Sequence, residues 1–290
     1  MTVTIHTGDC RDVLPTLAAG SVNCVVTSPP YFGLRDYGVL GQMGLEATPT
    51  EYVSSLVGVL REARRALRDD GTLWLNLGDT SNNRRRIRSS SHQPSLNGFS
   101  EPSWAEASKM GLTRLSIKDG DLKEKDMFGI PWSVAFALRA DGWFLRQEIV
   151  WSKSFGKPEP SGDRLPNRHE QVFLFSKSKN YYFDREALPD YASSSVWNVA
   201  PLGRGDHGAT FNGALVTPCI LAGCPAGGVV LDPFFGSGTT GVVASGLGRN
   251  AIGIELNPEF SGLAQALSPV TVKPFFSTRT QKVSKSRLLS

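Results

Sequence analysis

The stretch "VVLDPFFGSGTTG" at residues 229–241 predicts how this chain folds. An apolar run leads into Asp232, and a glycine-rich turn then opens a segment with the composition of a helix. Gly236 and Gly238 would let the backbone approach a ligand closely. The next apolar run, "NAIGIEL", ends on another acid, Glu255. This order predicts a βαβ unit that carries two acids at one edge of a parallel sheet.

The same alternation of strands and helices extends over most of the chain. Residues 80–126 are the main exception, because Ser, Asn, Arg, Pro and Gly dominate there and periodicity vanishes, which predicts a long insertion. Residues 184–206 are expected to be a loop, and the chain loses pattern after about residue 268. Strands are expected at 2–9, 23–28, 72–79, 144–154, 170–183, 227–234 and 250–256, and the strands 144–154 and 170–183 are expected to pair antiparallel. Helices are expected at 10–22, 51–71, 130–143, 212–224 and 238–248, with Gly71 and Gly142 as helix stops.

The composition is that of an ordinary globular protein. With 290 residues, 40% of them hydrophobic and 20% charged, the chain can bury one large domain or a domain with a lobe. No apolar run approaches the length of a membrane span, and the first residues lack the pattern of a signal peptide, so a cytoplasmic location is expected. The cysteines have no CxxC spacing, which favours reduced core thiols over a disulfide framework or a metal site.

Positive charge is concentrated in two segments although the net charge is only +4. The run "RRRIR" at 84–88 is dense in arginine, and the final residues hold five Lys or Arg and no acid. One interpretation is a solvated loop followed by a flexible tail at 269–290. The other is a surface that contacts phosphates, and the sequence leaves both open.

The acids at the ends of the two strands narrow the choice of ligand. Glu255 suits a pair of ribose hydroxyls, as in any adenosine-containing cofactor. The glycines Gly236, Gly238 and Gly241 formally satisfy GxGxxG, so a nicotinamide or flavin enzyme stays possible. Asp232, however, would repel a pyrophosphate and attract the α-ammonium group of S-adenosylmethionine. A simple helix N-cap is the alternative role for Asp232.

A second motif, "TSPPY" at 27–31, ends another predicted strand. Together with "DPFFGSGTT" it resembles the amino-methylating DNA methyltransferases, which modify cytosine N4 or adenine N6, and the motif order is that of their permuted beta class. Supporting matches are "GDC" at 8–10, "LWLNLGD" at 73–79, "EIVWSK" at 148–153, the segment 167–184 and "HGATF" at 207–211. The resemblance implies a Rossmann-like methyltransferase fold with a mostly parallel seven-stranded sheet, one antiparallel strand and circularly permuted motifs.

The resemblance also implies a division of the chain. Residues 1–79 and 127–268 would form a single catalytic domain, with the catalytic half first and the cofactor loop second. Residues 80–126 would be an inserted segment for DNA recognition, and 269–290 a basic tail.

Residue roles follow from the same resemblance, with S-adenosylmethionine as cofactor and no metal. Asp232, Phe234, Gly236 and Gly238 would line its methionine and adenosine parts, Glu255 would hold the ribose, and Asp9 would meet the adenine amino group. His207 and Phe211 match a cofactor-side motif. The catalytic tetrapeptide would be Ser28, Pro29, Pro30 and Tyr31.

That tetrapeptide suits methylation of an exocyclic amino group. The lone pair of such a nitrogen is delocalised into the ring, so acceptors must hold the group pyramidal. The Ser28 hydroxyl and the Pro29 carbonyl can each accept one amino hydrogen, and the diproline fixes their direction. Tyr31, expected to be exposed at the strand end, would stack on a base flipped out of the duplex.

The predicted function is therefore site-specific methylation of cytosine N4 in double-stranded DNA, by a bacterial or phage-encoded protein that could work beside a restriction endonuclease. Serine at position 28 is commoner among the cytosine enzymes of the family, but adenine N6 stays an alternative. A catalytically silent module that binds DNA is another. Glutamine methylation of proteins is disfavoured, because it typically uses Asn-Pro-Pro-Tyr after the glycine loop. Expected phosphate contacts are Arg35, Arg84, Arg85, Arg86 and Arg88.

Overall fold

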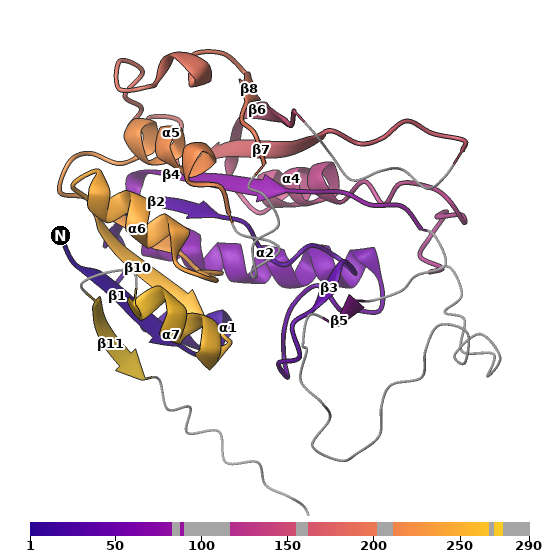
Figure 1. The fold of residues 1–290 in the computed structure, drawn as a ribbon, viewed down its shortest axis with the longest axis horizontal. Coiled ribbons are helices and arrows are strands. Elements are labelled where there is room, and N and C mark those ends of the chain that lie inside the picture. The colour runs from indigo at the N-terminus through magenta and orange to yellow at the C-terminus, as the bar shows by residue number, and fades with distance from the viewer. Residues whose placement is uncertain (83–87, 90–116, 155–161, 202–210, 267–269, 275–290) are drawn as a thin grey trace, which may run out of the picture.

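A computed structural model of the chain describes residues 1–82, 88–89, 117–154, 162–201, 211–266 and 270–274. Its centre is a twisted sheet that helices cover on both faces (Figure 1). In spatial order its strands are β11 (Val270–Pro274), β1 (Val3–Thr7), β10 (Asn250–Glu255), β9 (Val229–Asp232), β2 (Val22–Thr27), β4 (Leu67–Leu77), β7 (His169–Ser176), β6 (Phe144–Ser152) and β8 (Val196–Asn198).

The strand directions match the predicted fold class. β7 pairs antiparallel with β4 and with β6, and every other pair in the sheet is parallel, so β7 is its single antiparallel strand. The predicted count of seven strands is wrong, because the central sheet has nine among the described residues. β8 has only three residues and lies inside the expected loop, and β11 lies where no pattern was expected.

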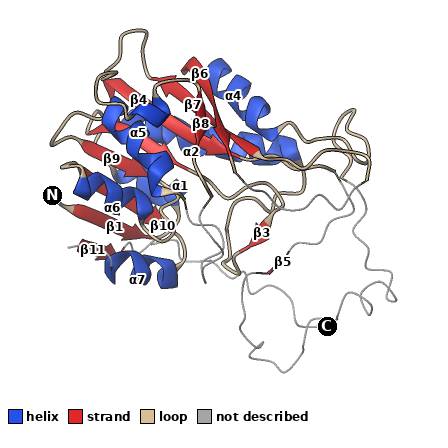
Figure 2. Cartoon of the chain, turned by 45° about the horizontal axis from the view of Figure 1, so that its top comes forward, coloured by secondary structure: helices blue, strands red, loops and turns tan. Residues whose placement is uncertain are grey.

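The helices form two layers (Figures 1 and 2). One face of the sheet carries α1 (Cys10–Val13), α2 (Pro49–Ala66) and α4 (Ile130–Ala140). The other carries α5 (Gly213–Gly223), α6 (Thr239–Gly246) and α7 (Pro258–Ala266). Single-turn 3-10 helices occupy Leu14–Thr16 and Asp190–Ala192.

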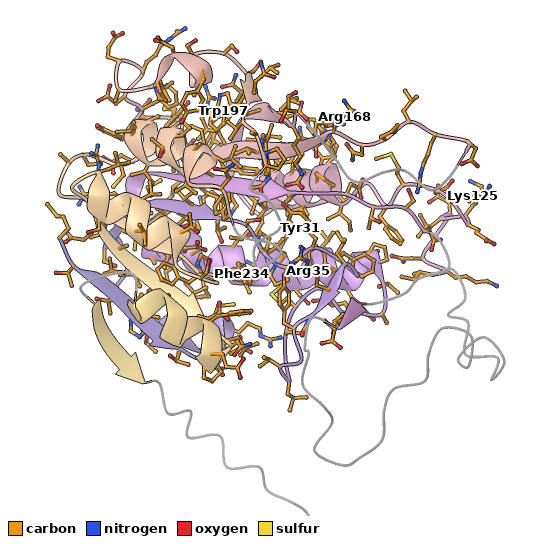
Figure 3. All side chains as sticks on the ribbon, in the orientation of Figure 1. Tyr31, Arg35, Lys125, Arg168, Trp197 and Phe234 are labelled. Atoms are coloured by element: carbon orange, nitrogen blue, oxygen red, sulfur yellow. The ribbon has the colours of Figure 1, made fainter. Side chains whose placement is uncertain are left out.

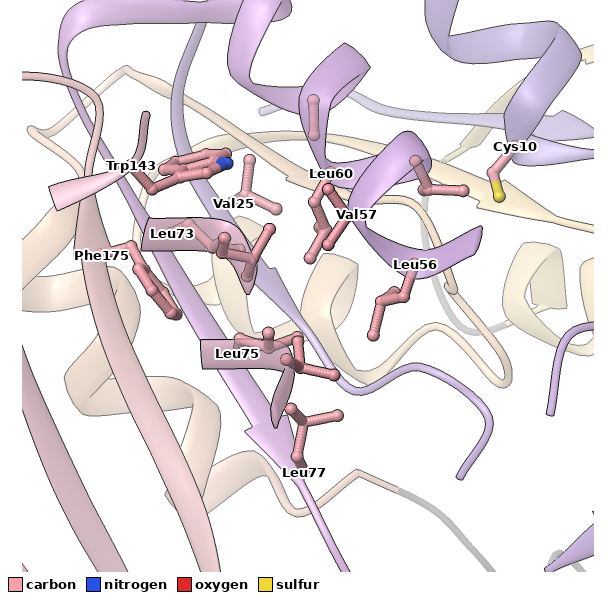
Figure 4. Close-up of a cluster of buried hydrophobic side chains, with 14 of the residues drawn as sticks. Cys10, Val25, Leu56, Val57, Leu60, Leu73, Leu75, Leu77, Trp143 and Phe175 are labelled. Atoms are coloured by element: carbon pink, nitrogen blue, oxygen red, sulfur yellow. The ribbon is translucent and has the colours of Figure 1, made fainter. Parts of the chain in front are cut away.

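Alternation along the strands builds both cores. Leu73, Leu75 and Leu77 of β4 point to the α2 face (Figure 4), whereas Trp74 points to the α5 face. All four cysteines are buried free thiols, as the spacing predicted. The sheet is thus apolar on both faces, as a parallel sheet between helix layers requires.

Two predicted helices end earlier than expected. The segment after Asp9 forms only α1 and one 3-10 turn, since Pro15 cannot donate the backbone bond that a continuing helix needs. α2 ends at Ala66, and Gly71 lies inside β4 instead of stopping the helix. The register on β2 jumps between Leu67 and Thr72, so the residues between them bulge out of the ladder.

The connections define where a ligand site can form. From β2 the chain crosses through α2 on one face, and from β9 it crosses through α6 on the opposite face. β2 and β9 are direct neighbours, so the fold has its topological switch point between them. In open α/β sheets ligands bind outside the carboxyl ends of the strands at such a point. Both sequence motifs follow these two strands.

Candidate active site

A hydrogen bond joins the two motifs at the switch point. Thr27 Oγ1, at the end of β2, donates to Asp232 Oδ1 at 2.6 Å, although the residues are 205 positions apart. Because Thr27 precedes the Ser-Pro-Pro-Tyr segment and Asp232 precedes the glycine turn, the bond sets the two segments side by side. Tyr31 and Phe234, one from each segment, lie near this edge of the sheet (Figure 3).

Asp232 is enclosed by the protein. Its side chain is buried, Oδ1 also accepts from the Phe234 amide at 3.0 Å, and Oδ2 accepts from Thr240 Oγ1 at 2.7 Å. Burial raises the pKa of Asp232 to about 6, against the opposing effect of these three donors. The geometry therefore speaks against the predicted ion pair with an ammonium group. Asp232 instead holds the glycine turn against β2.

The glycine turn is open on one side and packed on the other. Gly236 and Gly238 have φ of 53° and 88°, in the left-handed region that favours glycine. Nothing lies within 4 Å of where a Cβ on Gly236 would stand. Phe235, missed by the sequence analysis, is buried against Gly241 and Gly253, where a Cβ would come within 2.6 and 2.3 Å of its ring. The Phe235 ring thus packs between the glycine turn, α6 and β10 and holds the turn in place.

Glu255 supports the turn from the next strand. Its Oε2 accepts from the Gly236 amide at 2.7 Å, and Oε1 accepts from the Asn257 amide at 2.7 Å. Burial raises the pKa of this carboxyl, while the amides lower it. The side chain is only partly buried and each oxygen retains acceptor capacity, so hydroxyl donors can still bind it.

Asp9 lies at the same edge, just after β1, the strand that neighbours β10, and caps the N-terminus of α1. The Gly8 amide donates to the Glu255 carbonyl at 2.8 Å, which joins the ends of β1 and β10. Burial alone would raise the pKa of Asp9, but the hydrogen bonds and charge of Arg11 outweigh it and hold the pKa below its usual value. Arg11 also donates to the Gly41 carbonyl at 2.7 Å. The loop after the tetrapeptide is thus tied to the segment that carries Asp9.

The catalytic tetrapeptide is built rigidly. Ser28 is partly exposed, and Pro29 is buried beside it. The Tyr52 hydroxyl donates to the Pro30 carbonyl at 2.9 Å, so α2 holds the turn in place. Among the residues that the structure describes, none donates to the Pro29 carbonyl. The serine hydroxyl and that carbonyl are therefore available to a substrate.

Tyr31 differs from its prediction. Its hydroxyl points inward, where it donates to Glu170 Oε2 at 2.7 Å and lies 3.0 Å from Asn76 Oδ1. Its ring edge fits against Gly78, where a Cβ would come within 2.5 Å. Tyr31 is therefore partly buried and not exposed as predicted, because its hydroxyl finds acceptors inside the protein. Its stacking on a flipped base stays a prediction. Asn76 and Glu170 were missed although both lie in quoted motifs, since only cross-strand contacts bring them here.

The structure brings two predicted DNA-contacting arginines together. β3 (Arg35–Asp36) and β5 (Arg88–Ser89) form a parallel two-stranded sheet in which Arg35 pairs with Arg88. Arg84, Arg85 and Arg86 lie outside the described residues, as does His207. Phe211 is partly buried and packs against the core that α5, α6 and α7 form on their face of the sheet, a core that also contains Phe235 of the glycine turn.

The DNA methylase family, N6_N4_Mtase, matches residues 22–266 of this chain. The chain belongs to this family. It is therefore a DNA methylase that uses S-adenosylmethionine, and its motifs appear in the permuted order.

Characterised relatives are similar over nearly the whole methylase. The type II methyltransferase M.Cfr9I of Citrobacter freundii is 46% identical over 272 residues, which are 90% of this chain and 86% of the relative. M.SmaI of Serratia marcescens is 44% identical over 275 residues, which are 90% and 89% of the two chains.

Solved structures share the fold. The cytosine-N4-specific PvuII DNA methyltransferase superposes with a TM-score of 0.67 at 18% identity, covering 91% of this chain and 86% of that one. A DNA modification methylase of Thermus thermophilus, complexed with S-adenosyl-L-methionine, has a TM-score of 0.64 at 24% identity, covering 94% and 98%. Both confirm the Rossmann-like class of the methylase.

The residues at the switch point fit the cofactor. The open side of Gly236 leaves room beside the backbone, and the partly exposed Glu255 offers acceptors next to it. No helix in the described part of the methylase is long and apolar enough to cross a membrane. Within the same ranges, no group of three or more His, Cys, Asp or Glu side chains could hold a metal ion.

Proposed function

We propose that this methylase is a site-specific type II enzyme that methylates N4 of a flipped-out cytosine in double-stranded DNA, within a restriction-modification system that includes a cognate endonuclease. The Thr27–Asp232 bond carries the proposal, because it sets Ser28 and Pro29 beside the cofactor loop. The type II methyltransferases that are 44–46% identical to the chain support the site-specific, restriction-linked role. The family tendency for serine at position 28 supports cytosine.

The residues of the tetrapeptide account for the chemistry. S-adenosylmethionine supplies an electrophilic methyl group on a positively charged sulfonium. The Ser28 hydroxyl and the Pro29 carbonyl accept the two amino hydrogens of the base and direct its lone pair outward. The neutral Ser28 hydroxyl is too weak a base to take up the surplus proton of the methylated amino group, so that proton leaves to solvent after transfer. Tyr52 and the diproline keep both acceptors aimed, which lowers the cost of reorganisation.

The division of the site assigns roles to the cofactor-side residues. Phe234, Gly236, Gly238 and Glu255 contact the cofactor and Asp9 takes the adenine end, whereas Asp232 acts as a positioning residue beneath the turn. Arg35 and Arg88 contact phosphates, and residues 80–126 contribute to sequence recognition. The pairing of β5 with β3 supports this, because it ties that segment to the loop after the tetrapeptide.

The test is nucleoside mass spectrometry of DNA from cells that express the methylase. We expect N4-methylcytosine and no N6-methyladenine. The Ser28→Ala variant should lose about 100-fold in single-turnover rate, as expected for removal of one transition-state hydrogen bond, and should still bind S-adenosylmethionine. Ser21→Ala, on an exposed serine bonded to the Ala18 carbonyl, is the matched control.

Other outcomes identify the alternatives. N6-methyladenine alone would overturn the base assignment and leave a DNA methylase. Cofactor binding with no methylated base in any DNA would identify a silent binding module.

A further inference from the structure

An ion pair lies directly behind the catalytic tetrapeptide. Lys153, just after β6, bonds through Nζ to Glu170 Oε1 on β7. The two side chains are only 17% and 18% exposed, and Lys153 Nζ also lies 4.4 Å from the Trp151 ring centroid. A pair so enclosed is screened little by salt, and the carboxylate of Glu170 can only accept hydrogen bonds.

The charged carboxylate fixes the direction of the neighbouring bond. Glu170 Oε2 lies 2.7 Å from the Tyr31 hydroxyl, which has a single proton to give. A carboxylate is a stronger acceptor than the Asn76 amide oxygen at 3.0 Å, so Tyr31 donates to Glu170. Burial, and then the charge of Glu170, raise the pKa of Tyr31, which keeps that proton in place. The lone pairs of the Tyr31 oxygen are left facing Ser28.

Asn76 is oriented by two contacts from β7, one of which is Glu170 itself: Asn76 Nδ2 lies 3.4 Å from Glu170 Oε2. The same Nδ2 donates to the Gln171 carbonyl at 3.1 Å, which turns Oδ1 toward the tetrapeptide. Ser28 Oγ lies 3.3 Å from that oxygen and 3.4 Å from the Tyr31 hydroxyl oxygen. Both neighbours therefore accept, so the serine proton is directed into the protein. The lone pairs of Ser28 Oγ therefore point away from the protein interior.

We propose that Glu170 is a positioning residue of the methylase, which acts through Tyr31 and Asn76 to make the Ser28 hydroxyl a hydrogen-bond acceptor for the amino group of the target base. The inference rests on the proposed role of Ser28 as such an acceptor. Lys153 holds the Glu170 carboxylate in position through the ion pair, and neither residue exchanges a proton with the substrate. The Glu170→Gln change introduces an amide NH2 that could donate to the Tyr31 oxygen. Tyr31 would then donate toward Ser28 instead of accepting from it, which reverses the direction of these hydrogen bonds.

A double-mutant cycle tests the proposal. Glu170→Gln should lower the single-turnover rate at least 10-fold, with the KM for S-adenosylmethionine within error of wild type. Its thermal midpoint should fall, because Lys153 loses its partner, so the rate is measured at a temperature where the variant is folded. In a Ser28→Ala background the same change should have less than a twofold effect, because the acceptor it orients is gone. Tyr31→Phe breaks the chain without altering charge and should behave in the same way. Glu186→Gln, on an exposed glutamate, is the matched control.

The outcomes separate the two proposals. If Ser28→Ala loses activity but Glu170→Gln and Tyr31→Phe lower the rate equally in both backgrounds, the positioning role is wrong and the proposed function stands. If neither variant lowers the rate in the wild-type background, the positioning role is also wrong. If Ser28→Ala keeps its full rate, the proposed role of Ser28 fails, and the role of Glu170 fails with it.

Discussion

Asp232 links the two motifs from a buried position, and this burial raises the pKa of its carboxyl group. Its carboxylate accepts hydrogen bonds from Thr27, Thr240 and the Phe234 amide, yet it has no cationic partner in the described structure. Desolvation therefore outweighs the donors and raises its pKa from 3.8 to about 6. The folded protein favours the neutral form of Asp232 more than the unfolded chain does.

The sign of this shift predicts a dependence of stability on pH. A raised pKa contributes stability that is fully present below pH 3.8 and is lost as the pH rises through about 6. Relative to Asp232→Asn, which does not titrate, wild type should lose roughly 2 kcal/mol of unfolding free energy between pH 4 and pH 7. Urea unfolding of both proteins at intervals of half a pH unit measures the difference.

Thr240→Val sharpens this test at the same residue. It removes one of the donors that favour the carboxylate, so it should move the midpoint of the pH effect upward. A stability difference between wild type and Asp232→Asn that stays flat from pH 4 to pH 7 would show that Asp232 keeps an ordinary pKa.

At the scale of elements, the turn between β9 and α6 depends on what glycine leaves out. Phe235 fills the space beneath the turn because Gly241 and Gly253 have no side chains there. Gly253 lies on β10, so the ring also joins the turn to the strand that carries Glu255. The position of the glycine turn and of Glu255 therefore depends on the Phe235 ring and on glycine at positions 241 and 253.

Gly253→Ala should disturb this packing. The new Cβ would stand 2.3 Å from Phe235 Cγ, and because both residues are buried we expect a loss of about 1–3 kcal/mol in unfolding free energy. S-adenosylmethionine should also bind more weakly, as the ring shifts the turn. Gly246→Ala, at the end of α6 with nothing within 4 Å, is the control for adding a methyl group. Thermal unfolding that shows no difference between the two variants would contradict the packing argument.

The elements that the sequence predicted are those with a local signal. The unit from β9 to β10 was predicted because its apolar runs, glycine turn and terminal acid are consecutive, and the antiparallel pair β6–β7 was predicted from its spacing. β8 was missed because three residues carry no period, and Gly71 was misjudged because a bulge resembles a helix end. Asn76 and Glu170 were missed because the register of β4 on β7 decides their position.

At the scale of the whole molecule, the arrangement of charge matters more than its sum. A net charge of +4 on 290 residues would not attract DNA strongly by itself. The fold, however, pairs Arg35 with Arg88 in a short sheet, although they are far apart in the sequence. Arg35 lies four residues after Tyr31, and Arg88 ends the arginine run. The sheet thus places a basic ribbon beside the catalytic half.

This ribbon should act through phosphates and not through bases. Each phosphate contact contributes about 0.9 to the slope of log affinity against log salt, so Arg35→Gln with Arg88→Gln should reduce that slope by about 2. Neutralising Arg84, Arg85 and Arg86 as well should flatten the slope further. Arg61→Gln, on an arginine that is bound to Asp141 and 62% exposed, should leave the slope unchanged. Fluorescence anisotropy with a DNA duplex at several salt concentrations gives these slopes.

The same arginine variants should also bind specific and unrelated duplexes more weakly to an equal degree, because phosphate contacts carry no sequence information. A loss confined to the specific duplex would show instead that these arginines read bases.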